Sequence, residues 1–516
     1  MRTNLVRDTH GVSLVLVLGV SLLVGCGESK VTSTPVNGAS LSWTQGQYAP
    51  FDQYMNRCAA PRSGIDPATG RPYEDRAGSA AHEKFALRSY SHQAYLWAGQ
   101  LSDQDPTTSL NPQEYFDLLK IPSDRFHFYE SSQKNYQEFV LGKPLSYGIS
   151  WFRDGNQEVV VTYVERNSPA ALAGVVRGDR VVTIDGLTEQ ALGYDRFITA
   201  VYPTDDSPSH RFVFKNSRGE VQAEKRLTAE EIQVNSVQNI SYFSAADGHT
   251  VAYFSFGSFN GTAERELTEA VNTINQHGAQ DLILDLRFNG GGYLDVASEL
   301  AFMVGGTSLK GVRVFSTLRY APGNNLYGGD EEIAFFDTTQ GAGGDMPKGQ
   351  ALPSLNLKRL YVLTSHSTCS ASESLINGLR GADFPVIQVG AATCGKPYGM
   401  IPLSNCGFEY FTINFRYENA KGFSDFENGL APRNSVQAQG SPLGCEVSDP
   451  YNEPLGSLQE PLLAAALLFA LPAAAQQAAK SGSDTATARG RTMRAGLCMS
   501  SPNVVAVNRA KHRFVR

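Results

Sequence analysis

The chain has 516 residues, of which 41% are hydrophobic and 18% charged, and its formal net charge is −7. At about 150 residues per domain, this length predicts roughly three domains, each able to bury a core. The negative balance gives no reason to expect a nucleic-acid partner. Composition thus indicates a multidomain globular protein, and its function must come from motifs.

Residues 1–25 have the features of an export signal. They carry Arg2 and Arg7, continue in an apolar run of 13 residues, and end in the sequence LVGC at Cys26. The charge, the length and the small residue before the cut are typical of a secretory signal, and the apolar run is too short to cross a bilayer. The ending resembles a bacterial lipobox, which implies cleavage before Cys26 and lipidation of its thiol. Gly27 after the cysteine implies an outer-membrane destination.

Two segments follow the signal. Residues 26–76 are polar and rich in Gly, Pro and Ser, which predicts a tether. Residues 77–138 predict a small helical region, because apolar and aromatic side chains recur at helical spacing between Ser79 and Leu119. These aromatic side chains are expected to form a core.

Residues 140–232 carry a second resemblance. Ser168–Gly174, with the sequence SPAALAG, and Arg177–Gly186, with the sequence RGDRVVTIDG, resemble the short helix and following strand of a PDZ domain. In such domains a backbone loop captures the C-terminal carboxylate of a peptide, and the peptide adds a strand to the sheet edge. The resemblance places the peptide-binding residues in the loop that begins at Ser146: Tyr147, Gly148 and Ile149. A PDZ domain kept only as a spacer is the alternative.

The segment 233–478 alternates between strand and helix patterns, which predicts an α/β core. The expected strands are 251–256, 281–286 and 311–318, and the expected helices are 263–276 and 293–304. Ala321–Lys348 is expected to be a loop excursion. The apolar run Pro461–Ala475 is too short for a membrane span and predicts a buried helix. Residues 479–516 predict a polar, basic tail beyond the compact domain.

One predicted strand-helix-strand unit places a serine and a lysine, Ser370 and Lys396, at the same edge of the sheet. The apolar run Leu360–Leu363 predicts a strand, and Ala371–Leu379 predicts a helix, so that Ser370 lies at a helix N-terminus, where free N–H groups favour an oxyanion. Val386–Val389 predicts the next strand, with Lys396 in the loop beyond it. A lysine can act as a base when desolvation lowers its pKa, and Ser-Lys pairs are a known variant of the catalytic triad.

Three motifs in chain order carry a family resemblance. The motifs are DLRFNGGG at Asp285–Gly292, SASE at Ser370–Glu373 and GK at Gly395–Lys396, and a PDZ-like stretch precedes them. Together they resemble the carboxyl-terminal-processing, or tail-specific, serine peptidases. The resemblance implies a crotonase-like or Clp-like α/β catalytic core for residues 233–478, and a reaction that needs neither metal nor cofactor.

The resemblance also implies a role for each residue. Ser370 is the expected nucleophile and Lys396 the expected general base. The backbone N–H groups of Gly291 and Ala371 are the expected oxyanion hole. A run of three glycines permits positive φ and close approach to a ligand, which supports this role independently of the family.

Some positions leave alternatives open. Met400 stands where the family has a glutamine that orients the lysine, so either another group positions Lys396 or the site is weakened. His366 is an alternative base, and Glu373 suits the first helical turn electrostatically. Ser131 begins an SxxK string typical of penicillin-recognising enzymes, but the companion motifs of that class are absent, so chance is the better account.

Cysteine usage favours disulfides over a metal site. With Cys26 lipidated, six cysteines remain in an exported chain, and no CxxC or HExxH spacing occurs. A bridge between Cys394 and Cys406 is expected to pin the loop that carries Lys396. Cys369 is the alternative partner.

The sequence therefore predicts a lipid-anchored serine endopeptidase of the bacterial cell envelope that faces the periplasm. Its expected substrates are exported polypeptides, whose C-termini the PDZ domain could bind. The rival hypothesis is a PDZ-bearing peptide-binding lipoprotein without turnover.

Overall fold

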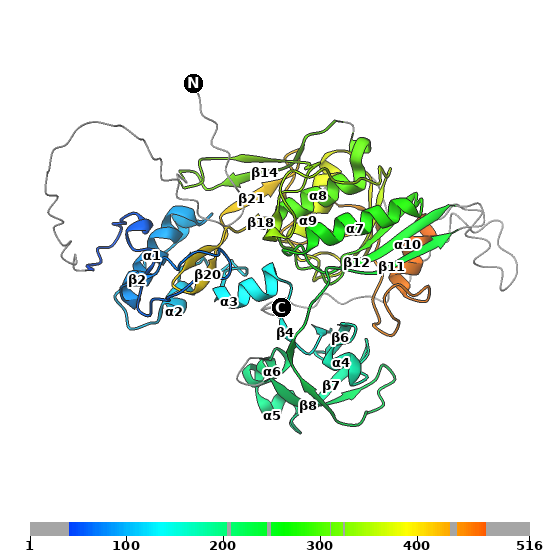
Figure 1. The fold of residues 1–516 in the computed structure, drawn as a ribbon, viewed down its shortest axis with the longest axis horizontal. Coiled ribbons are helices and arrows are strands. Elements are labelled where there is room, and N and C mark those ends of the chain that lie inside the picture. The colour runs from blue at the N-terminus through cyan, green and yellow to red at the C-terminus, as the bar shows by residue number, and fades with distance from the viewer. Residues whose placement is uncertain are drawn as a thin grey trace, which may run out of the picture. The chain divides into compact units, whose positions relative to one another are not determined.

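The computed structural model describes residues 41–203, 208–244, 249–309, 311–323, 326–433 and 441–470. The predicted signal peptide, Cys26 and the tail 479–516 lie outside these residues. The chain divides into two compact units (Figure 1). The N-terminal unit comprises Met1–Gln133, Tyr320–Gly329 and Met400–Phe415, and the core unit comprises the remaining segments.

The N-terminal unit contains short helices and small sheets. Its elements are the 3-10 helices η1 (Phe51–Gln53) and η2 (Ala98–Gln100), the strands β1 (Arg57–Cys58) and β2 (Arg76–Ala77), the helices α1 (Ala80–Ala94) and α2 (Pro112–Phe116), and the sheet β19-β20-β3 (Leu403–Asn405, Phe408–Phe411, Phe128–Ser131). α2 begins with Pro112 after the capping residue Asn111, whose side chain accepts a hydrogen bond from Glu114 N. Residues from the predicted aromatic stripe are buried together with Tyr410 of β20. The predicted aromatic core is thereby confirmed.

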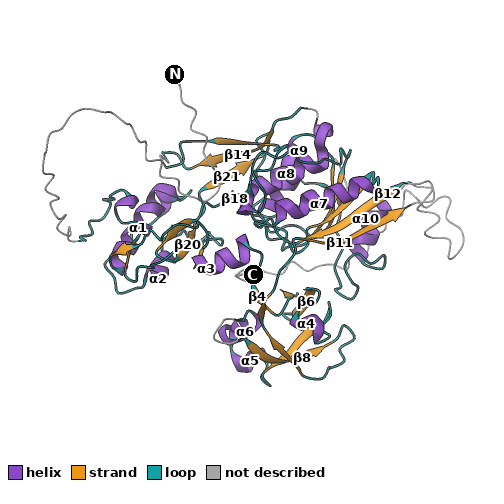
Figure 2. Cartoon of the chain, in the orientation of Figure 1, coloured by secondary structure: helices purple, strands orange, loops and turns teal. Residues whose placement is uncertain are grey.

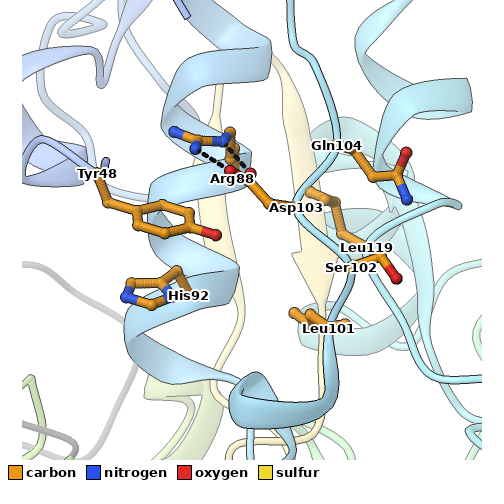
Figure 3. A pocket seen from close by; sticks show the side chains of 8 residues that line it. All are labelled: Tyr48, Arg88, His92, Leu101, Ser102, Asp103, Gln104 and Leu119. Carbon is orange, nitrogen blue, oxygen red and sulfur yellow. Dashed lines mark hydrogen bonds and ion pairs between the residues drawn. The ribbon is translucent and has the colours of Figure 1, made fainter. Parts of the chain in front are cut away.

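A small pocket of the N-terminal unit shows how its first described segment is fastened (Figure 3). Arg88 of α1 forms a buried ion pair with Asp103 at 2.6 Å. The ring of Tyr48 stacks on His92, with 3.6 Å between ring centroids, and Arg88 lies over the same Tyr48 ring. Tyr48, Arg88, His92 and Asp103 therefore interact with one another and hold the segment around Tyr48 against α1.

The PDZ region forms a five-stranded antiparallel sheet. The order is β5-β6-β7-β8-β9, and the strands are Ile149–Arg153, Val159–Val164, Arg180–Ile184, Ser209–Lys215 and Lys225–Thr228. Three short helices accompany the sheet: α4 (Pro169–Leu172), α5 (Glu189–Leu192) and α6 (Tyr194–Val201). β4 (Leu145–Ser146) pairs with β10 (Glu230–Glu231), so the ends of the region are joined. β5 is the terminal strand at one end of this sheet.

The core unit is built on a six-stranded sheet of order β11-β12-β13-β16-β17-β22. The strands are Val237–Ser244, Thr250–Phe256, Asp281–Asp285, Leu360–Thr364, Val386–Gly390 and Leu443–Cys445. Within this sheet the five strands β12, β13, β16, β17 and β22 run parallel, and β11 is antiparallel to β12. β13, β16 and β17 are buried along their whole length, as is typical of a parallel sheet with both faces covered. That double burial explains why these strands are continuous apolar runs in the sequence.

Helices cover both faces of this sheet. α10 (Pro461–Ala470) packs on one face, against Tyr253, Ile283 and Leu363 among others. α8 (Leu294–Gly305) contacts both α7 (Ala263–Gln276) and α9 (Ala371–Gly381), as Figure 2 shows. None of the helices in the described part of the chain is long and apolar enough to cross a membrane. Of the buried helix predicted for Pro461–Ala475, the part Pro461–Ala470 is helical and largely buried, and residues 471–475 lie outside the described residues.

A smaller sheet of order β15-β14-β21-β18 lies in the segments that follow α8. Its strands are Glu331–Ala334, Val314–Tyr320, Phe415–Glu418 and Tyr398–Gly399. The loop predicted for Ala321–Lys348 was wrong in part, because β15 pairs antiparallel with β14. β15 ends its sheet and buries only Ile333, so its sequence lacks the apolar alternation that would have indicated a strand.

Candidate active site

The predicted catalytic motifs follow three neighbouring parallel strands. The DLRFNGGG motif leaves the end of β13, Ser370 follows β16, and Lys396 follows β17. β16 is hydrogen-bonded to both of the other strands, with Asp285 opposite Leu363 and Thr364 opposite Gly390. The carboxyl ends of these strands therefore meet at one edge of the sheet, where open α/β sheets bind ligands.

The glycine turn and the loop before α9 are in direct contact. The carbonyl of Asn289 accepts a hydrogen bond from Cys369 N at 3.0 Å and another from Ser372 Oγ at 3.2 Å. Gly291 has φ +108°, and a Cβ placed on it would lie 2.7 Å from Ser370 Cβ. Position 291 therefore requires a glycine for two reasons: its positive φ and the close approach of Ser370.

The two N–H groups predicted for the oxyanion hole lie on either side of this contact. A Cβ on Gly291 would also lie 3.0 Å from Ala371 N, so the two residues are close neighbours. The Gly291 N–H donates to Asn289 Oδ1 at 2.9 Å in this conformation. An oxyanion that uses the Gly291 donor must therefore share or displace the Asn289 amide oxygen.

Ser370 occupies a strained turn between β16 and α9. Its backbone has φ 56° and ψ −114°, a conformation that favours glycine and that costs about 1–3 kcal/mol in other residues. The carbonyl of Ser370 accepts the first helical hydrogen bond from Ser374 N at 2.8 Å. Nucleophiles on strand-to-helix turns adopt such strained geometry because it exposes the hydroxyl.

Glu373 connects Ser370 to the loop that carries Lys396. Its Oε2 accepts hydrogen bonds from the backbone N–H groups of Ser370 and Lys396, at 3.0 and 2.8 Å. Its Oε1 accepts from Gly395 N at 2.8 Å and from Thr393 Oγ1 at 2.5 Å. The side chain is fully buried, and burial raises its pKa although the four hydrogen bonds oppose the rise. Glu373 therefore does more than complement the helix dipole: it fixes where the loop of Lys396 lies.

A disulfide joins the same two loops, and it corrects the predicted pairing. Cys369 is bonded to Cys394, with 5.2 Å between their Cα atoms, and Cys406 is bonded to Cys58 in the N-terminal unit. The predicted Cys394–Cys406 bridge was wrong, and the alternative partner Cys369 is the one observed. The reason is topological, because the ends of the adjacent strands β16 and β17 bring Cys369 beside Cys394.

The cluster of Cys369, Glu373 and Cys394 has the donor atoms of a metal site within 4.8 Å of one another. The two sulfurs are joined in the disulfide, and the carboxylate already accepts four hydrogen bonds. These atoms are thus used in holding the loops together and do not fit a metal ion.

A cluster of buried ion pairs surrounds Arg287, which precedes the glycine turn in the chain. The guanidinium of Arg287 is fully buried and contacts three carboxylates: Asp285 at 2.6 Å, Glu460 at 2.7 Å and Asp449 at 2.8 Å. Although burial alone would raise the pKa of Asp449, Arg287 and Arg177 hold it below its usual range. Arg177 reaches Asp449 from the PDZ region at 2.6 Å. Arg287, which lies two positions before Asn289, is therefore anchored to segments that are distant in sequence.

Other predicted residues lie as follows. His366 is exposed in the loop between β16 and Ser370. Met400 belongs to the N-terminal unit. In the PDZ region, Tyr147 is buried and donates to the carbonyl of Ala200, Gly148 has φ +78° and its N–H donates to Ser146 Oγ, and Ile149 begins the edge strand β5.

Sequence reasoning missed one residue that touches both loops, Tyr417 of β21. Its hydroxyl lies 2.9 Å from the carbonyl oxygen of Ser370 and 2.8 Å from that of Lys396. The sequence did hold a partial signal, because Phe415 and Tyr417 are the apolar positions of a short alternating run. That alternation indicates a buried strand residue and says nothing about what the hydroxyl contacts.

Comparisons with known proteins agree with this architecture. The family model of Peptidase family S41 matches residues 250–432, and that of the PDZ domain matches residues 160–188. A carboxyl-terminal-processing protease of a Picosynechococcus species is 26% identical over 230 residues, which are 44% of this chain and 48% of the relative. A protein of the same name from a Synechocystis species is 28% identical over 233 residues, 44% of this chain and 47% of the relative. The chain thus spans about half the length of these curated relatives.

The fold is shared with a solved structure described as a putative S41 protease from Bacteroides fragilis. It aligns with a TM-score of 0.56 at 20% identity and covers 74% of this chain and 96% of that one. The predicted α/β multidomain fold and the predicted resemblance to carboxyl-terminal-processing peptidases are both confirmed. Residues 250–432 are thus similar to Peptidase family S41, and residues 160–188, which precede them in the chain, are similar to a PDZ domain.

Proposed function

We propose that this chain is a serine endopeptidase that cleaves polypeptides with Ser370 as nucleophile and Lys396 as general base. One observation carries the proposal: the backbones of Ser370 and Lys396 bind the same oxygen of Glu373, beside a glycine turn that contacts Ser370. Nucleophile, base and oxyanion donors thereby converge at the end of three adjacent strands.

The chemistry follows the usual order of acyl transfer. Ser370 Oγ attacks the scissile carbonyl while its proton passes to Lys396 Nζ, and the N–H groups of Ala371 and Gly291 stabilise the oxyanion. Collapse breaks the C–N bond, and the leaving amine takes the proton from Lys396. Water, deprotonated by Lys396, then hydrolyses the ester on Ser370 and releases the acid.

The PDZ domain supplies the binding of the substrate's C-terminus. Its loop Ser146–Ile149 leads directly into β5, the strand that ends the sheet, and α6 follows β7 in the chain. A peptide that pairs with β5 places its terminal carboxylate at the loop N–H groups and its last side chain near Tyr147 and Phe197 of the PDZ core.

Location is proposed from the N-terminal sequence. The lipobox-like ending at Cys26 supports a lipid anchor, and the polar residues between Cys26 and the segment held against α1 support a tether in the periplasm, with the outer membrane as destination. The two disulfides fit an oxidising compartment, where such bonds persist. Exported polypeptides are accordingly the substrate class.

Two measurements test the proposed chemistry. A fluorophosphonate is added to the purified full chain, and mass spectrometry locates the adduct, which we expect on Ser370. Cleavage of an unfolded protein substrate is then compared between wild type and Ser370→Ala, which we expect to be inactive. Equal and negligible cleavage by both would favour the peptide-binding lipoprotein instead, and an adduct confined to Ser131 would favour a penicillin-recognising hydrolase.

A further inference from the structure

We propose that Tyr417 is a positioning residue for the catalytic pair, whose hydroxyl holds the main chains of Ser370 and Lys396 at a fixed spacing. This inference rests on the proposed function, because it assigns Tyr417 a role in the reaction of those two residues. It names a third side chain, distant in sequence, on which the geometry of the pair depends.

The contacts of Tyr417 point to this role. Its hydroxyl lies 2.9 Å from the carbonyl oxygen of Ser370 and 2.8 Å from the carbonyl oxygen of Lys396. Its own backbone N–H donates to the carbonyl of Pro397 at 3.0 Å. Both ends of the residue therefore contact the loop of the base, and the side chain, which is 2% exposed, spans from there to the nucleophile.

The hydroxyl of Tyr417 and the carboxylate of Glu373 contact different backbone groups of the same two residues. Glu373 Oε2 accepts the N–H groups of Ser370 and Lys396, and Tyr417 supplies the donor for the carbonyl groups of the same two residues. The carboxylate of Glu373 thus contacts the N–H groups of the pair, and the hydroxyl of Tyr417 lies between their carbonyl groups. Moving Lys396 away from Ser370 would break its hydrogen bond to Glu373 and its contact with the Tyr417 hydroxyl.

The two carbonyl groups do not depend on the hydroxyl equally. The carbonyl of Ser370 also accepts the helical hydrogen bond from Ser374 N at 2.8 Å. A hydroxyl has a single proton to donate, so the carbonyl of Lys396 is the acceptor that gains more from it. Loss of the hydroxyl is therefore expected to release the base more than the nucleophile.

The protonation state of Tyr417 suits a permanent donor. Burial raises the pKa of its phenol well above the usual range, and the negative charge of Glu373 adds to this rise. The hydroxyl consequently keeps its proton at every pH at which a peptidase assay is run. Its ring is held by Phe426, with 5.9 Å between the centroids.

The test replaces only the hydroxyl. Tyr417→Phe keeps the ring, and Tyr361→Phe is the matched control, because the Tyr361 hydroxyl is also buried and donates to a backbone carbonyl, that of Phe469, at 3.2 Å. The rates of steady-state cleavage and of fluorophosphonate labelling are divided by the concentration of folded protein, which is obtained from thermal melts. We expect Tyr417→Phe to lower kcat and the labelling rate about tenfold or more with KM nearly unchanged, and Tyr361→Phe to change neither.

Several outcomes would overturn the proposal. One is a Tyr417→Phe enzyme with the kcat of wild type, and another is an equal loss in Tyr361→Phe. A Tyr417→Phe chain that does not fold, beside a folded Tyr361→Phe chain, would show that the hydroxyl serves the fold. Failure of the proposed function is distinguishable, because Ser370→Ala would then cleave as wild type does.

Discussion

Ser370 and Lys396 donate their backbone N–H groups to one oxygen, Oε2 of Glu373, at 3.0 and 2.8 Å. The two residues are 26 positions apart in sequence and follow different strands. A single buried carboxylate thus sets the spacing of the candidate nucleophile and base. This arrangement supplies a physical answer to the departure at Met400, because main-chain hydrogen bonds position the loop of Lys396.

The first prediction concerns Glu373→Gln. An amide presents one acceptor oxygen in place of two, so whichever way it turns, two of the four donors lose their partner. We expect kcat/KM to fall about 10- to 100-fold through misplacement of the base. Glu409→Gln is the control, because Glu409 is also buried but, within the described part of the chain, accepts from the hydroxyls of Ser132 and Ser404, which can turn. Wild-type kinetics in a folded Glu373→Gln enzyme would show that this carboxylate does not set the geometry.

The second prediction concerns the Cys369–Cys394 disulfide. It links the residues beside Ser370 and Lys396, so its reduction by dithiothreitol is expected to slow fluorophosphonate labelling of Ser370 about tenfold. A Cys58→Ser/Cys406→Ser chain should keep this sensitivity, because that bridge lies in the other unit. A Cys369→Ser/Cys394→Ser chain should label slowly with or without reductant. Unchanged labelling after mass spectrometry has shown two freed thiols at Cys369 and Cys394 would contradict the prediction.

The third prediction concerns pH and the buried carboxyl pair Glu264 and Glu299. Both accept from Gln340 N, at 2.6 and 2.7 Å, and both are fully buried. Burial, followed by the neighbouring Glu264, raises the pKa of Glu299 to about 10. The folded protein therefore keeps a proton that the unfolded chain loses above about pH 4.5, so the stability from this proton is full below that pH and is lost progressively as the pH rises toward 10.

Glu299→Gln tests this linkage, because its amide mimics the protonated acid. We expect the free energy of unfolding of wild type to fall with pH by up to about 1.4 kcal/mol per pH unit between pH 5 and 9, and the variant to show a flatter dependence. Urea unfolding at several pH values measures it, and Glu269→Gln on the exposed side of α7 is the control. Parallel curves for wild type and Glu299→Gln would contradict a proton held by Glu299.

The fourth prediction concerns the PDZ loop. Gly148 has φ +78°, and a Cβ placed on it would lie 2.2 Å from Ser168 Cβ, so Gly148→Ala must displace the loop. We expect the Kd for a peptide with a free C-terminal carboxylate to rise at least about tenfold, a change of roughly 1.4 kcal/mol. Gly155→Ala, where a Cβ meets open space, should bind as wild type does. Equal binding of the free-acid and C-terminally amidated peptides to wild type would remove the role of the loop.

Much of the fold was predictable because local periodicity matched burial. Ala263–Gln276 is helical as predicted, since Leu267, Val271 and Ile274 form one buried face. The placement of Ser370 before a helix and of Lys396 after the next strand followed from the same pattern. Parallel strand order then brings their loops to one edge.

The rest depended on contacts between distant segments. Cys58 and Cys406 are 348 positions apart, and no spacing in the sequence could reveal that they meet while Cys394 pairs with Cys369. The alternation around Tyr417 predicts a buried position but not the two carbonyl groups at its hydroxyl. The position of Glu373 in the first helical turn suggested an interaction with the helix dipole. In the structure its carboxylate accepts three hydrogen bonds from the loop after β17 and one from Ser370 N.

The most direct test of the catalytic account changes the amine alone. Lys396→Met keeps the length of the side chain and removes the amine, and Lys358→Met is the control, because Lys358 is exposed and lies two residues before β16. Proteolysis of an unfolded substrate is measured together with fluorophosphonate labelling of Ser370. The account predicts that Lys396→Met loses both activities while Lys358→Met keeps them. Undiminished proteolysis by a folded Lys396→Met enzyme would contradict it.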